Sequence, residues 1–185
     1  MRELLQLVGF FLLFLRFAFW VGSSLPILTT KWRQVLVAQA TEGVLLVFFY
    51  AQLFGNVQIL LFPLHVPTLL IGFALVWMGV AGAFSAKKQL GDAWVYAGTY
   101  RIVAKQKLTT TGIYGIVRHP LYSSIIVSYV GIEVLAGSWL FVSALFLFIP
   151  FYFQAKNEEK LLIAHFGKQY ESYRKKTKML VPGIY

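Results

Sequence analysis

Long apolar runs alternate with short polar connections along the chain, and this pattern predicts a bundle of membrane-spanning helices. A hydrocarbon core about 30 Å thick requires roughly 20 mostly apolar residues per helix. Five runs approach that length, at residues 4–22, 35–54, 66–86, 121–136 and 138–155. The sequence therefore predicts an all-α integral membrane protein with five transmembrane helices in a single domain, residues 1–185.

The first apolar run is expected to be a retained helix rather than a signal peptide. Arg2 precedes the run, as in a signal peptide, but Arg16 interrupts it and no clean cleavage site follows. The last two runs are separated by little more than Gly137, which predicts a tight antiparallel hairpin.

Basic residues predict the orientation of the bundle. Fifteen of the 17 Lys and Arg residues lie on one predicted side, in the first connection, the loop 87–120 and the tail 156–185. Because positive residues are retained on the cytoplasmic side, the loop and the tail should be cytoplasmic. The N-terminus, residues 56–65 and the Gly137 turn should then lie outside.

Three charged residues lie within the apolar runs, where an unpaired charge is costly. Arg16 and Glu42 fall at matched depth, so we expect them to form an ion pair, with contact to a substrate as the alternative. Glu133 lies near the outer end of its helix and is expected to reach interfacial water. Small residues of the third run recur at spacings typical of close helix packing: Gly72, Gly79, Gly82 and Ala83.

Composition excludes several classes of function. The chain is 58% hydrophobic, 17% aromatic and only 13% charged, which is too apolar for an ordinary soluble domain. It has no Cys, and its three His residues are far apart, so neither a disulfide nor a metal site is expected. The formal net charge of +10 lies in loops and the tail, where lipid headgroups explain it better than nucleic acid does.

A first polar cluster ends the only long connection of the chain, residues 87–120. Long connections in compact proteins are commonly functional. Arg118 and His119 precede Pro120, which suits the first position of a helix. The positive end of that helix and Arg118 could bind an anion, while His119 could donate a hydrogen bond to a carboxylate. The alternative is that these residues only anchor the helix at the membrane interface.

A second polar cluster follows the fifth apolar run. Glu158 and Glu159 come about one turn beyond Ala155, and an apolar face continues at helical spacing, so we expect a C-terminal amphipathic cytoplasmic helix carrying Leu162, Phe166, Tyr170 and Tyr173. A carboxylate here could bind a ribose diol or a cation, or could simply be solvated. The predicted hairpin about Gly137 brings His119 and Glu158 into one neighbourhood.

At these two clusters the chain resembles the isoprenylcysteine carboxyl methyltransferase and phospholipid methyltransferase family. The resemblance covers the C-terminal half, residues 90–185, and depends on an ordered set of positions. The matched residues are Leu108, Gly112, Ile113, Tyr114, Arg118, His119, Pro120, Tyr122, Glu158, Glu159, Phe166, Gly167, Tyr170 and Pro182.

This resemblance implies methyl transfer from S-adenosyl-L-methionine to a lipophilic or prenylated acceptor in the membrane. The implied donor-binding residues are Gln106, Lys107, Leu108, Thr109, Tyr114, His119, Pro120, Leu121, Tyr122 and Glu158. His119, Tyr122 and the helix N-terminus would take the carboxylate of the donor, and Glu158 its adenosyl portion or ammonium. The chain has no Rossmann-type glycine fingerprint that would offer a soluble donor fold.

Two departures from the family pattern bear on the acceptor. Arg118 and Gln154 are the candidate catalytic residues for holding an acceptor carboxylate, but Gln154 stands where carboxyl methyltransferases of the family carry Arg. Gln106 replaces a usual His. The leading expectation is a carboxylate of isoprenylcysteine type, and the alternatives are a phospholipid amine or a non-catalytic lipid-binding protein. Membrane sterol reductases share a similar Arg-His-Pro pattern but have about twice as many spans.

Overall fold

The computed structural model describes residues 2–24, 43–44, 46–52, 54, 61–91 and 107–184, and its regular elements in this part of the chain are helices. Two isolated β-bridges are the only extended pairings among these residues. The long helices are α1 (Arg2–Ser24), α3 (Val66–Leu90), α4 (Pro120–Ala136) and α5 (Ala144–Phe166). Shorter elements are the 3-10 helices η3 (Gly112–Gly115) and η4 (Trp139–Ser143) and the terminal helix α6 (Lys168–Lys176).

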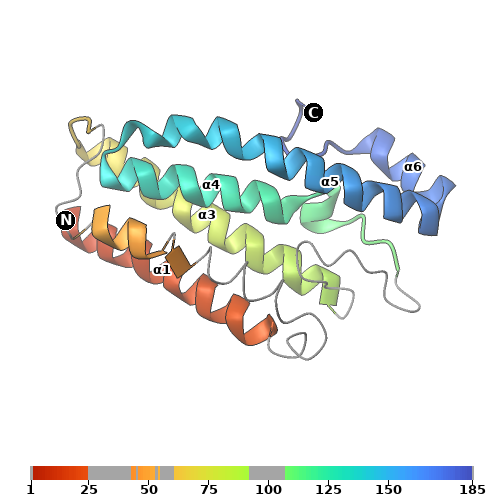
Figure 1. Ribbon diagram of the computed structural model, residues 1–185, viewed down its shortest axis with the longest axis horizontal. Coiled ribbons are helices and arrows are strands. Elements are labelled where there is room, and N and C mark those ends of the chain that lie inside the picture. The colour runs from red at the N-terminus through yellow and green to blue at the C-terminus, as the bar shows by residue number, and fades with distance from the viewer. Residues whose placement is uncertain are drawn as a thin grey trace.

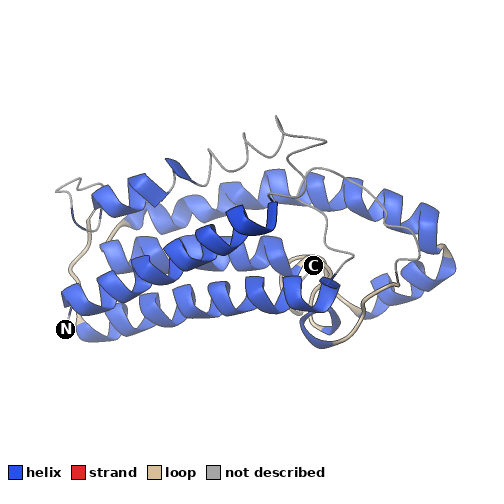
Figure 2. Cartoon of the chain, turned by 90° about the horizontal axis from the view of Figure 1, so that it is seen from below, coloured by secondary structure: helices blue, strands red, loops and turns tan. Residues whose placement is uncertain are grey.

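The long helices lie side by side along the long axis of the molecule (Figure 1; Figure 2). α4 packs against α3, α1 and α5, and α6 packs against α5. The turn between α4 and α5 lies at the same end as the N-terminus, while α3 ends, α4 begins and α5 ends at the opposite end, beside α6 (Figure 1). We call these the Gly137 end and the His119 end.

α3 and α4 approach closely because small residues face one another. A Cβ atom added at Gly79 would lie 2.2 Å from Ser128 Oγ, and one at Gly131 would lie 2.6 Å from the backbone nitrogen of Val76. Neither position can hold a larger residue without moving a helix. The predicted close packing of the small residues in α3 is therefore confirmed, and the partner is α4.

Substitution of Gly79 by alanine should destabilise the protein although it raises helix propensity. The added methyl group meets the backbone of α4 as well as Ser128, and such overpacking typically costs about 1–3 kcal/mol. Gly43→Ala is the matched control, because among the residues that the structure describes its Cβ would meet Phe17 alone, at 3.9 Å. Thermal unfolding in detergent should show a lower melting temperature for Gly79→Ala alone. Equal melting temperatures would contradict the packing described.

The hairpin between α4 and α5 is confirmed, and Gly137 ends α4 in the left-handed conformation with φ 70°. The amide of Ser138 donates to the carbonyl of Glu133 at 2.9 Å, and the amide of Gly137 donates to the carbonyl of Val134 at 3.1 Å. Together these two bonds form a Schellman motif. The fifth predicted run, residues 138–155, lies almost entirely within the helical stretch Trp139–Phe166, which begins as a 3-10 helix. Ser138 Oγ accepts from the amide of Leu140 and starts η4, so α5 begins only at Ala144.

Within the described residues, two helical stretches are long and apolar enough to cross a membrane, α3 and the continuous helix Trp139–Phe166. α3 runs four residues beyond the predicted end of its span, to Leu90. Shorter apolar stretches lie at Gln6–Leu15 and Pro120–Ala136. Large apolar side chains of α5, such as Phe146 and Phe153, are exposed on the bundle, as a lipid-facing surface requires. Five spans and their orientation stay a prediction.

The charges within the apolar runs differ from expectation at one position. The expected pair of Arg16 and Glu42 lies outside the described side chains. Glu133 is fully buried rather than exposed to interfacial water, and Gln52 Nε2 donates to its carboxylate at 3.2 Å. This bond offsets part of the cost of burying the carboxylate.

The expected continuous tail helix is divided at Gly167. This residue has φ 52°, where a side chain would be strained, and its amide ends α5 by donating to the carbonyl of Ile163 at 2.8 Å. α6 then turns back against the protein and buries Tyr170 and Tyr173. The tail therefore returns to the His119 end of the bundle.

Candidate functional site at the start of α4

The last residues of the chain strap the start of α4. The amide of Arg118 donates to the carbonyl of Lys178 at 2.8 Å, and the amide of His119 donates to that of Met179 at 3.1 Å. Ser123 Oγ adds a hydrogen bond to the carbonyl of Leu180 at 2.5 Å. We call residues 177–181 the tail strap. It holds His119 at the N-cap of α4, in a non-helical conformation, directly before Pro120.

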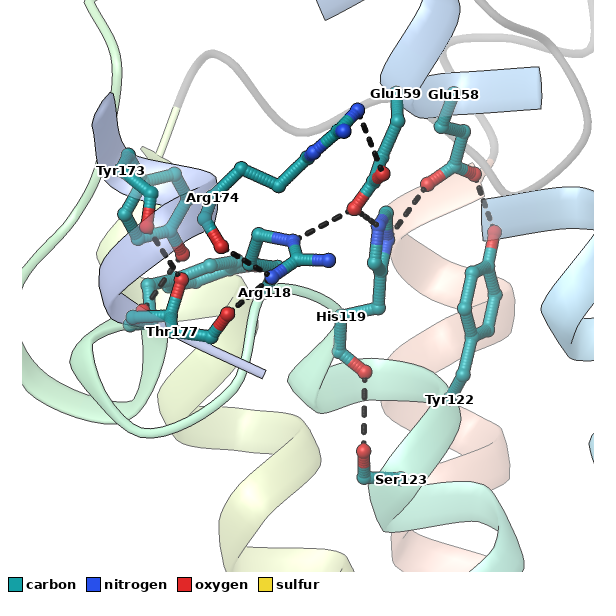
Figure 3. A network of polar contacts seen from close by, with 10 residues as sticks. Arg118, His119, Tyr122, Ser123, Glu158, Glu159, Tyr173, Arg174 and Thr177 are labelled. Atoms are coloured by element: carbon teal, nitrogen blue, oxygen red, sulfur yellow. Dashed lines mark hydrogen bonds and ion pairs between the residues drawn. The ribbon is translucent and has the colours of Figure 1, made fainter. Parts of the chain in front are cut away.

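His119, Tyr122 and Glu158 form the core of the candidate site (Figure 3). The imidazole of His119 is only 6% exposed, and its Nδ1 lies 3.2 Å from Glu158 Oε2. The hydroxyl of Tyr122 donates to Glu158 Oε1. The rings of His119 and Tyr122 are stacked at 5.8 Å, and Phe151 of α5 stacks on Tyr122 at 5.0 Å. The prediction that the hairpin brings His119 and Glu158 together is confirmed.

Glu159 points to the other side of His119 and is 2% exposed. Its Oε1 lies 2.6 Å from Arg118 Nε and 3.5 Å from His119 Nε2. Arg118 Nη1 also donates to the carbonyls of Arg174, at 3.1 Å, and of Thr177. The guanidinium of Arg118 is thus engaged with one carboxylate and two backbone carbonyls.

Protonated His119 is stabilised by this environment. Burial alone would lower the pKa of His119, but hydrogen bonds and negative charges from Glu158 and Glu159 outweigh it and raise the pKa above its ordinary 6.5. Two carboxylates on opposite sides of one imidazole therefore favour a positively charged ring.

The raised pKa predicts that stability falls as the pH rises. The charged ring contributes fully below about pH 6.5, where it is also protonated in the unfolded chain, and its contribution is lost as the pH rises through the higher folded-state pKa. The melting temperature in detergent should therefore fall as the pH rises above 6.5. His119→Gln should flatten this slope, and His165→Gln, which removes an exposed imidazole, should keep it. An unchanged slope in His119→Gln would contradict the assignment.

Of the other predicted site residues, those that the structure describes lie in α4, in α5 and in or just before η3. Pro120 and Leu121 are buried in the first turn of α4, and Gln154 is half-buried on α5, one turn before Glu158. The hydroxyl of Tyr114 is directed to the carbonyl of Ala86 at the end of α3, at 3.4 Å. Lys107, Leu108 and Thr109 lie in a segment without regular secondary structure before η3, and Gln106 is outside the described residues.

Sequence reasoning missed the contributions of Glu159, Phe151 and the tail strap. Glu158 and Glu159 are adjacent and identical, so no local signal separates a carboxylate facing Tyr122 from one facing Arg118. The strap is short and irregular, and its bonds to Arg118 and His119 join residues about 60 positions apart. Only the tertiary structure reveals them.

An apolar pocket of about 290 Å³ adjoins the site on the outer side of α5. Its wall belongs to the same buried cluster as Tyr122 and Ala155. The pocket is lined by Phe148, Ile149, Tyr152 and Phe153 of α5 and by Met179, Leu180 and Val181. The tail strap therefore borders both the polar core and the apolar pocket.

Two curated proteins are similar in sequence to this chain. A protein-S-isoprenylcysteine O-methyltransferase of Schizosaccharomyces pombe is 33% identical over 102 residues, 54% of this chain and 43% of that protein. Methanethiol S-methyltransferase 2 of Bradyrhizobium diazoefficiens is 34% identical over 127 residues, 63% of this chain and 47% of that protein. The chain thus spans less than half the length of these curated relatives.

A solved structure and a family profile complete the comparison. The structure of a eukaryotic intramembrane Ras methyltransferase, an isoprenylcysteine carboxyl methyltransferase, superposes with a TM-score of 0.49 and 19% identity, over 80% of this chain and 67% of that one. The profile of the phospholipid methyltransferase family matches residues 67–169, more than half of the chain, from the first turn of α3 to α6. The chain belongs to the phospholipid methyltransferase family.

Proposed function

We propose that this protein transfers a methyl group from S-adenosyl-L-methionine to a lipophilic acceptor at the His119 end of the bundle. The observation that carries the proposal is the placement of His119 between two carboxylates, next to Tyr122 and beside an apolar pocket. The positive-inside distribution of Lys and Arg supports a site at the cytoplasmic face of the membrane.

The residues of the core suit the two ends of the donor. Glu158 keeps 27% of its side chain exposed, so its carboxylate is accessible to the ammonium or a ribose hydroxyl of the donor. The positive end of α4 suits the carboxylate of the donor, and His119, whose ring nitrogens face Glu158 and Glu159, holds Glu158 beside it. Tyr122 orients Glu158 through its hydroxyl. Bound S-adenosyl-L-methionine would supply a methyl group already activated on a sulfonium.

The chain itself has to align the acceptor and exclude water. Methyl transfer is an in-line displacement, so positioning provides much of the rate enhancement. The apolar pocket between α5 and the tail strap would hold the lipophilic part of the acceptor, and its volume lies near the lower end for small-molecule sites. Apolar walls beside the polar core also keep water from the reacting groups.

The nature of the acceptor group follows from the charges around the core. A carboxylate of isoprenylcysteine type is the acceptor expected from the sequence, and the S. pombe relative is named for that substrate. Arg118 is engaged with Glu159 and two carbonyls, and Gln154 brings no charge. These contacts favour an uncharged nucleophile, such as the thiol in the name of the B. diazoefficiens relative. A thiol or an amine must give up a proton, and we assign its acceptance to Glu158, the partly exposed carboxylate of the core.

Transfer of labelled methyl groups tests this proposal. The full chain, purified in detergent, is incubated with methyl-labelled S-adenosyl-L-methionine and, separately, an alkyl thiol, a prenylcysteine and phosphatidylethanolamine. Label should enter a lipophilic product, with the thiol methylated faster than the prenylcysteine carboxylate. Methylation of the amine would identify the phospholipid alternative. No transfer to any acceptor from well-folded protein would favour the non-catalytic alternative and overturn the proposal.

A further inference from the structure

We propose that Glu159 is a positioning residue that acts through Arg118 to hold the tail strap, and thereby shapes both the donor subsite and the apolar pocket. The names of the two subsites rest on the proposed function. The contacts that join Glu159, Arg118 and the strap are independent of it. Glu158 and Glu159, although adjacent, then have different tasks.

The two glutamates face different partners because successive residues lie about 100° apart around a helix. Glu158 is partly exposed and contacts Tyr122 and His119 Nδ1. Glu159 is almost fully buried and contacts Arg118 Nε and His119 Nε2. Glu159 therefore has no access to a ligand and can affect one only through its neighbours.

Arg118 connects Glu159 to the tail. Its Nε binds the carboxylate, while its Nη1 donates to the carbonyls of Arg174 and Thr177, at the C-terminal end of α6 (Figure 3). The last carbonyls of a helix lack helical partners, so Arg118 satisfies groups that would otherwise need water. The planar guanidinium presents its donors in a fixed fork, which suits a carboxylate and two carbonyls at once. The bond from Nε to Glu159 orients this fork toward the two carbonyls.

The tail strap contacts both subsites, so a change in its position affects both of them. Its carbonyls at Lys178 and Met179 accept the amides of Arg118 and His119, which sets the N-cap of α4 at the donor side. Its side chains at Met179, Leu180 and Val181 line the apolar pocket. Loss of the Glu159 contact should therefore loosen the pocket wall and the His119 position together.

Arg174 does not duplicate this function. Its Nη1 lies 4.0 Å from Glu159 Oε2, and its side chain is 46% exposed. An exposed ion pair of this kind contributes little to holding a segment in place.

Cysteine labelling tests the proposal directly, because the chain has no native Cys. Met179→Cys places a thiol at a fully buried position of the strap, and Ile184→Cys places one at an exposed position beyond it. Each is combined with Glu159→Gln or Glu158→Gln, and the rate of maleimide labelling is measured. Glu159→Gln should accelerate labelling at position 179 at least about tenfold, because the strap opens more often, and should leave position 184 unchanged. Equal rates at position 179 with and without Glu159→Gln would overturn the proposal.

Binding and kinetics provide a second readout that distinguishes positioning from contact with a ligand. Glu159→Gln should weaken S-adenosylhomocysteine binding and raise the acceptor KM, each roughly tenfold. A loss of this size is typical when a residue that supports a binding group is replaced. The kcat at saturation should change little, because Glu159 touches no reacting group. Glu158→Gln should weaken donor binding without changing labelling at position 179. A Glu159→Gln enzyme that loses kcat alone would contradict a positioning role.

A paired variant keeps the test valid if Glu159→Gln alone does not fold. Arg118→Gln combined with Glu159→Gln replaces the ion pair with two amides that can bond to each other. If Arg118 and Glu159 act through one contact, the double variant labels at position 179 no faster than Arg118→Gln alone. Faster labelling of the double variant would show separate roles and overturn the proposal. A wild-type protein that does not bind S-adenosylhomocysteine would defeat the proposed function but leave the labelling comparison intact.

Discussion

Replacement of Arg118 by leucine is expected to lower the free energy of unfolding by about 3–5 kcal/mol, because it leaves Glu159 as a buried carboxylate without its main partner. Arg118 and Glu159 are 8% and 2% exposed, and their closest atoms are 2.6 Å apart. The change also removes the donors to the carbonyls of Arg174 and Thr177. Thermal or denaturant unfolding in detergent measures the loss.

Arg174→Leu is the matched control for this prediction. It removes an arginine that approaches the same carboxylate, but from a half-exposed position at 4.0 Å. Exposed ion pairs contribute about 0–1 kcal/mol, so this variant should stay close to the wild type. If both leucine variants lost the same stability, burial of the Arg118 and Glu159 pair would not be what stabilises this end of the bundle.

Glu158→Gln is expected to slow methyl transfer by a factor of about 100 at low donor concentration. A charged hydrogen bond contributes about 1.5–3 kcal/mol, and 2.7 kcal/mol corresponds to a factor of about 100. Glutamine keeps the size of the side chain but removes the negative charge that would face the donor and His119. Initial rates with limiting labelled donor measure the effect.

Glu171→Gln makes the same chemical change at an exposed position of α6 and should keep the wild-type rate. A Glu158→Gln rate within about threefold of the wild-type rate would exclude this carboxylate from donor binding. Folding of both variants is checked by their melting temperatures, so that loss of rate is not mistaken for loss of structure.

The sequence predicted those features that depend on hydropathy and local residue preference. Apolar runs located α1, α3, α4 and much of α5, and the small residues of α3 predicted its close contact with α4. The position of Gly137 predicted the hairpin and thereby the meeting of His119 with Glu158. Each of these follows from one segment or from a short connection between two segments.

The features that could not be predicted depend on tertiary contacts. Helical periodicity continued through Gly167 because its neighbours are apolar at the right spacing, but the backbone turns there and redirects the tail. Glu133 gave no sign of burial, since its partner Gln52 lies 81 residues away. Glu159 contacts Arg118, and Arg118 is bound in turn by the irregular tail strap, so the position of Glu159 in this cluster could not be read from its own segment.

The affinity of the wild-type protein for S-adenosylhomocysteine tests the central claim most directly. Isothermal titration of the full chain in detergent, repeated with His119→Ala and Glu158→Ala, asks whether the start of α4 and the end of α5 form one donor site. We predict saturable binding to the wild type that is lost in both variants. Absence of binding to well-folded wild-type protein, or binding that survives in both variants, would contradict the account.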